Sequence, residues 1–169
     1  MPKAILASAA GGMVAGAAGT IAMTMSERLE MSVSGRAGSQ VPGQVGASLL
    51  PGRDGGSDKD VPQLNAAVHW AHGIAMGTVR AALGSAGLQG PTASVAHFAL
   101  VWGGDAALYR ALGIADVPWR WGTDELASDV LHKGVYAAVT GTVYDALSAD
   151  NAGTAPPTTS PITPLHGGR

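Results

Sequence analysis

The chain has 169 residues, enough for one domain, and only 13% of them are Asp, Glu, Lys or Arg, with a formal net charge of −2 at pH 7. This charge content is about half that of an average soluble domain, too low to cover a water-exposed surface. The net charge provides no basic field for nucleic acid, and the lack of cysteine excludes disulfides and thiolate chemistry.

Small residues dominate the apolar composition. Glycine occurs 25 times and phenylalanine once, so the chain has few bulky side chains with which to fill an aqueous core. Helices rich in glycine and alanine suit a bilayer, where close backbone approach replaces the hydrophobic effect between helices. The composition therefore favours a multi-pass protein of the cell membrane.

The first predicted helix covers about residues 4–28. Its first 22 residues, 4–25, carry no charge and are long enough to cross a hydrocarbon core. A cleaved signal peptide is the alternative, because Lys3 precedes the apolar run. Small residues recur on this helix every four positions and predict a helix-packing face. They are Ser8, Gly12, Gly16 and Thr20.

A long polar loop over 29–64 follows, in which a short helix is expected after Pro42. Three further helices are predicted, with Gly73 and Gly77 as packing positions on the first of them. Their approximate ranges are 65–88, 92–113 and 124–147.

These elements predict an all-α fold, a four-helix transmembrane bundle over residues 1–147. Residues 148–169 are rich in Pro and Thr and are expected to form a disordered tail. Lys and Arg concentrate in the first and third connections, which predicts that both termini are extracytoplasmic. The expected partners are the lipid bilayer and a second copy of the chain or another membrane protein.

The titratable side chains of each helix gather on one side, as a low-dielectric surrounding requires. Folding the chain about its turns predicts one layer that contains His72, Asp105 and His132. Asp129 and Lys133 are expected beside this layer. The remaining candidates for polar contacts inside the bundle are His69, His97 and Arg80.

Two functions fit this layer. It could handle protons, ions or a small solute, or it could only fix helix packing in a membrane scaffold or accessory subunit. A third, haem- or metal-dependent redox function is suggested by the HxxH pair His69 and His72, or by His72 with His97 or His132 as axial ligands. Without a nucleophile–base pair, phosphate loop or carboxylate dyad, the sequence predicts neither an enzyme nor a bound cofactor or metal.

Several segments together resemble a group of small four-helix integral membrane proteins of high-GC actinobacteria. They include "HWAHGIAMGTVR" (69–80), "LGIADVPWRWG" (112–122) and "DVLHKGVYAAVTGTVYD" (129–145). The likeness to the inner-membrane proteins grouped with YagU is looser. The resemblance implies a multi-span membrane protein; these groups have no established activity, so it assigns no functional residue.

Overall fold

The computed structural model describes residues 2–50 and 61–153. Within these ranges the chain is entirely helical, which confirms the predicted all-α class. One 3₁₀ turn, Pro118–Arg120, precedes the last helix. The five α-helices are α1 (Pro2–Ser34), α2 (Val41–Leu49), α3 (Val61–Ser85), α4 (Gly90–Ala111) and α5 (Thr123–Gly153).

Proline and glycine mark the helix boundaries. Pro42, Pro62 and Pro91 each stand second in their helix, where the missing N–H is not needed and the fixed φ angle suits the first turn. Gly35 and Gly113 follow α1 and α4 with φ angles of 71° and 70°, the left-handed conformation that commonly ends a helix.

Two predicted boundaries were wrong. The first helix continues beyond residue 28 to Ser34, and α5 continues beyond residue 147 to Gly153. Residues 148–153 are therefore helical and do not belong to a disordered tail; this stretch contains Ala and no Pro, so nothing in it breaks the helix. The rest of the predicted tail, 154–169, and part of the polar loop, 51–60, lie outside the described residues.

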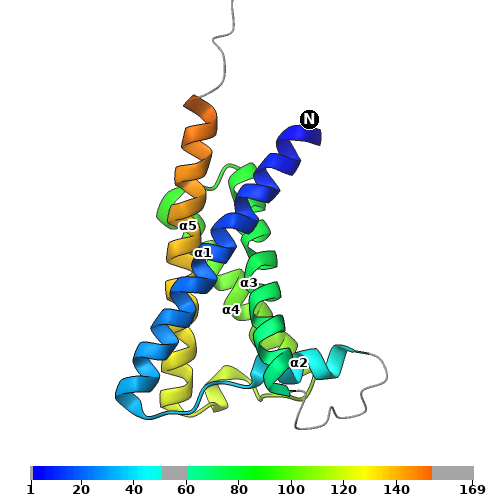
Figure 1. Ribbon diagram of the computed structural model, residues 1–169, viewed down its shortest axis with the longest axis vertical. Helices are drawn as coiled ribbons and strands as arrows, with labels where there is room; N and C mark the ends of the chain where they lie inside the picture. Colours follow the sequence, from blue (N-terminus) through cyan, green and yellow to red (C-terminus); the bar gives the residue numbers. More distant parts are fainter. Residues whose placement is uncertain (1, 51–60, 154–169) are drawn as a thin grey trace, which may run out of the picture.

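The four long helices form a bundle that opens toward one end (Figure 1). α1 crosses in front, between α3 and α5, and α4 lies behind them. The N-terminus and the turn between α3 and α4 lie at one end, which we call the terminal end. α2 and the connection between α4 and α5 lie at the other, the loop end.

Glycine lets α1 approach its neighbours closely. A Cβ atom at Gly77 of α3 would overlap the carbonyl oxygen of Gly12, and one at Gly16 would press on the carbonyl oxygen of Gly73. Thr20 packs on Gly73 and is almost fully buried. Ser8 makes no such contact; it shares a hydrogen bond of 2.8 Å with the hydroxyl of Tyr144.

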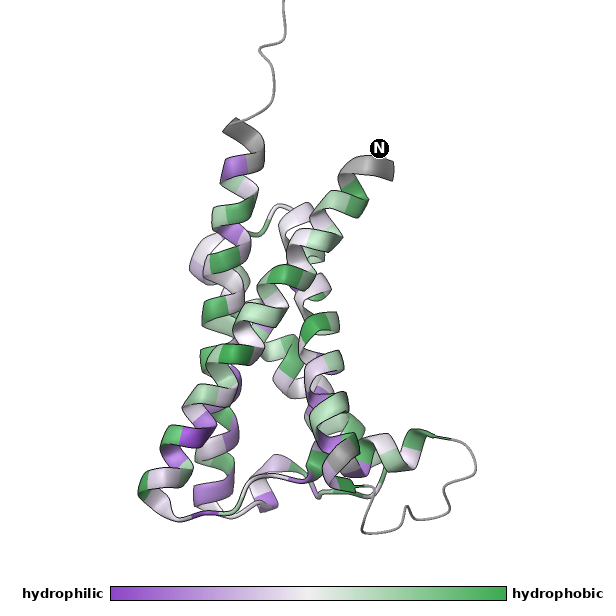
Figure 2. Cartoon of the chain, viewed as in Figure 1, coloured by the Kyte–Doolittle hydropathy of each residue, from purple (hydrophilic) through white to green (hydrophobic). Residues whose placement is uncertain are grey.

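Polar groups are buried in this bundle and large apolar groups are exposed. Hydrophilic positions are densest toward the loop end (Figure 2). By length and hydropathy, α1 over Ile5–Ser34 is the one helix in the described part of the chain that could cross a membrane. The other long helices carry titratable side chains on their inner faces, which lowers their mean hydropathy. Among the buried side chains are Arg80, His97, Asp105, His132 and Lys133.

Replacing Gly77 with Ala is expected to lower the stability of the fold by about 1–3 kcal/mol, because the new methyl group would overlap the backbone of α1. Gly11→Ala is the matched control, since nothing lies within 4 Å of its Cβ position. In a helix this control should raise stability by up to about 1 kcal/mol. Thermal unfolding of the purified protein in detergent measures both, and equal midpoints would contradict the close approach of α1 and α3.

Candidate functional site

Four charged or titratable side chains from three helices meet inside the bundle. The Oδ1 atom of Asp105 on α4 lies 3.0 Å from His72 Nε2 on α3, and its Oδ2 atom lies 3.2 Å from Lys133 Nζ on α5. Lys133 Nζ also lies 2.9 Å from Asp129 Oδ1. We call His72, Asp105, Asp129 and Lys133 the Asp105 centre.

Two of the four side chains of this centre come from α5. Asp129 and Lys133 are four residues apart, so both point from the same side of the helix toward α4. Trp102 of α4 donates its indole N–H to Asp129 Oδ2 at 2.9 Å, and the ring of Tyr109 lies 5.1 Å from Lys133 Nζ. The ammonium therefore faces two carboxylates and one aromatic ring.

The charges of the Asp105 centre do not cancel when His72 is neutral. Asp105 and Asp129 contribute two negative charges and Lys133 contributes one positive charge, which leaves one negative charge. The side chains of Asp105 and Lys133 are each only 6% exposed, whereas those of Asp129 and His72 are 25% and 37% exposed, so the centre lies at the edge of the buried region. One proton on His72, or one monovalent cation, would make the centre neutral.

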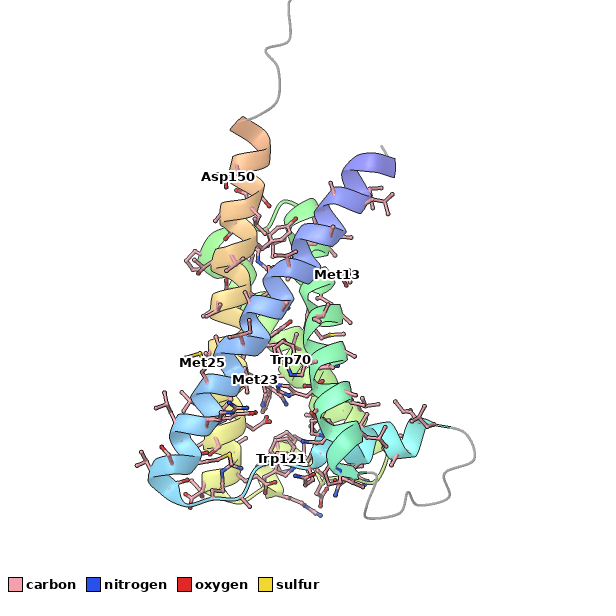
Figure 3. All side chains as sticks on the ribbon, viewed as in Figure 1. Met13, Met23, Met25, Trp70, Trp121 and Asp150 are labelled. Carbon is pink, nitrogen blue, oxygen red and sulfur yellow. The ribbon has the colours of Figure 1, made fainter. Side chains whose placement is uncertain are left out.

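Two adjacent cavities, which share five lining residues, lie between the loop end and this centre. The vestibule has a volume of about 500 Å³, and Trp121, which lies at the loop end in Figure 3, is one of its lining residues. The inner cavity, of about 70 Å³, lies deeper and is lined by His72 and Asp105. Five residues, one from each α-helix, line both cavities and form a neck between them. They are Met23, Pro42, His69, Tyr109 and Lys133.

His132 does not join Asp105, although the sequence predicts both in one layer. Its Nδ1 atom lies 2.9 Å from Ser26 Oγ on α1, and its Nε2 atom lies 3.7 Å from Glu30 Oε2. Residues 132 and 133 are adjacent on α5 and point about 100° apart, so Lys133 reaches Asp105 while His132 faces α1. Folding the chain about its turns estimates depth in the bundle but not this direction.

The other two histidines make separate contacts. His69 shares a hydrogen bond of 3.2 Å with Thr24 Oγ1 and forms part of the neck. His97 is fully buried nearer the terminal end, where its Nε2 atom lies 3.0 Å from the carbonyl oxygen of Met76. These contacts tie α3 to α1 and α4, which is a packing role for both rings.

Arg80 belongs to a second cluster, nearer the terminal end. Its side chain is fully buried, pairs with Asp145 of α5 and lies 4.8 Å from the ring centre of Tyr144. Sequence reasoning placed Arg80 toward this end but missed Asp145. A signal was present, because Asp145 is the one carboxylate of α5 between residues 130 and 149.

The loop end carries a group of exposed charges outside the cavities. Arg110 and Arg120 both approach Asp116, at 3.7 and 3.1 Å. The backbone N–H of Val117 and the Arg120 guanidinium hold the pKa of Asp116 below its usual range. Trp119 is 79% exposed beside them. Arginine and tryptophan are typical of a membrane–water boundary.

Comparison with known proteins identifies no relative of this chain. No family model, curated protein or solved structure matches this chain. The resemblance to the actinobacterial membrane proteins stays a prediction. Among residues 2–50 and 61–153, no group of three or more His, Asp or Glu side chains is arranged to hold a metal ion.

Arg80→Met is expected to destabilise the protein by about 3 kcal/mol, because Asp145 would keep its charge without a partner. This value is at the low end for a buried pair, since Asp145 is 34% exposed and partly solvated. Adding Asp145→Ala should recover most of the loss by removing the unpaired charge. Unfolding midpoints of the single and double variants test the pair; a double variant no more stable than Arg80→Met would contradict it.

Proposed function

We propose that this protein spans the membrane with α1, α3, α4 and α5. The support is the distribution of exposed residues in the middle of each helix. In these middle segments every residue classed as exposed is uncharged, as contact with lipid requires, and the one partly exposed charge, Asp145, is paired with Arg80. The segments are 5–25 of α1, 66–85 of α3, 91–107 of α4 and 130–146 of α5.

The loop end faces the cytoplasm in this proposal, and both termini are extracytoplasmic. Arg28, Arg110 and Arg120 lie at the loop end, where a positive bias favours the cytoplasmic side. The small side chains exposed on α3, such as Ala71 and Ala75, leave room for close contact with a second copy or another membrane helix.

We further propose that the Asp105 centre takes up and releases a proton or a small ion that enters through the vestibule. The observation that carries this proposal is the Asp105 centre itself, in which two carboxylates face one lysine beside a histidine that can accept a proton. Ionisable groups inside a membrane commonly mark ion pathways, because placing a charged side chain in the bilayer costs free energy and such residues are otherwise rare there.

The alternative function is a scaffold in which the same contacts only hold α3, α4 and α5 together. It is favoured by the pairing of Lys133 with two carboxylates, which satisfies the lysine without any ligand. A haem- or metal-dependent redox function has less support, because the Nε2 atoms of His72 and His97 already face Asp105 and the carbonyl oxygen of Met76.

Proton flux into vesicles separates these functions. The protein is reconstituted in liposomes that contain a pH-sensitive dye, with valinomycin and potassium to balance charge. We expect an imposed pH gradient to collapse faster with the wild type than in empty vesicles. Asp105→Asn should return the rate to that of empty vesicles, because the uncompensated charge is removed.

Asp116→Asn is the matched control, since Asp116 lies on the exposed loop outside both cavities. It should behave like the wild type. A wild-type rate equal to that of empty vesicles, with Asp105→Asn unable to fold, would instead support the scaffold.

A further inference from the structure

The ammonium group of Lys133 occupies a site shaped for a primary ammonium ion. Its contacts are Asp105 Oδ2 at 3.2 Å, Asp129 Oδ1 at 2.9 Å and the ring of Tyr109 at 5.1 Å. A primary ammonium has three N–H donors and no acceptor, and aromatic faces attract such cations. Two carboxylates and a ring therefore match this chemistry.

The two carboxylates that contact Lys133 line different cavities. Asp129 lines the vestibule and not the inner cavity, whereas Asp105 lines the inner cavity and not the vestibule. Lys133 lines both and pairs with both carboxylates. The Lys133 ammonium therefore lies between the carboxylate that lines the vestibule and the carboxylate that lines the inner cavity.

Resting on the function proposed above, we propose that the substrate is a small primary ammonium ion, ammonium itself or a short alkylammonium, which reaches Asp105 by replacing Lys133 between the two carboxylates. The lysine can yield because its ammonium is carried on a flexible four-carbon stem. The incoming ion then makes the contacts that the lysine side chain gives up.

The charge and size of the centre favour this class of ion. Exchange of the Lys133 ammonium for one monovalent cation leaves the charge between the two carboxylates unchanged, whereas a divalent cation would change it. A calcium ion takes six to eight oxygen ligands, more than two carboxylates provide. The inner cavity, at about 70 Å³, is small and mostly lined by apolar side chains, which disfavours a large hydrated ion.

A proton on His72 should weaken binding of the ion, because it places a positive charge 3.0 Å from Asp105, one of the two carboxylates that the ion contacts. The residues that line the inner cavity together with His72 come from all five α-helices. α1 and α2 contribute no titratable side chain to it. The titratable groups are His69 of α3, Asp105 and Tyr109 of α4, and Lys133 and Tyr136 of α5.

Calorimetric titration of the full-length protein in detergent with methylammonium chloride tests the proposal. We expect one saturable site for methylammonium and none for tetramethylammonium, which has no N–H donor to offer the two carboxylates. Asp129→Asn should weaken methylammonium binding by about tenfold or more, because the bound ion then contacts one carboxylate in place of two. Asp116→Asn, the matched control, should bind like the wild type.

Equal binding of the two cations, or equal binding by Asp129→Asn and Asp116→Asn, would overturn the proposal. The comparison of methylammonium with tetramethylammonium uses only the wild type, so it still tests the proposal if Asp129→Asn does not fold. If methylammonium does not bind while vesicles still show proton flux that depends on Asp105, the substrate class is wrong and the proposed function stands. If that flux is also missing, the proposed function itself is contradicted.

Discussion

A charged lysine inside a bundle needs opposite charge within contact distance, and the rest of this structure is arranged around that requirement. Removing an ammonium from water costs several kcal/mol, which only close and well-oriented carboxylates offset. Lys133 lies within 3.2 Å of Asp105 and Asp129, and Asp105 also holds His72 of α3. These contacts fix the mutual positions of α3, α4 and α5. The same requirement explains the second cluster, where Asp145 faces the fully buried Arg80.

Much of the fold could be predicted because its signals are local. The uncharged run at residues 4–25 and the four-residue spacing of small side chains follow from the sequence, and the structure places Gly12, Gly16 and Thr20 against α3. Helix ends were harder to predict. α1 reaches Ser34 through a polar stretch that reads as loop, and it stops where Gly35 adopts a positive φ angle. The charge and polarity of a segment indicate whether lipid or water surrounds it more reliably than they indicate where its helix ends.

The candidate site could be predicted only in part. Helical periodicity identified which faces carry titratable groups, and folding the chain about its turns placed His72 near Asp105. It did not decide between His132 and Lys133, because adjacent residues on α5 differ in direction and the helix rotation depends on tertiary packing. The aromatic partners Trp102 and Tyr109 gave no signal, since both residue types are common in helices that only pack. The neck was beyond sequence reasoning, because each helix contributes one residue to it.

The central claim is that the uncharged outer faces of the helices contact lipid while the charges face inward. The chain has no cysteine, so single-cysteine variants can carry spin labels without background. Labels at Leu100 of α4 and Ala138 of α5, both exposed, are compared in bilayers with a label at Trp119 of the loop end. The account predicts frequent collisions with oxygen and few with a water-soluble nickel complex at Leu100 and Ala138, and the reverse at Trp119. Equal access of the nickel complex to all three positions would contradict it.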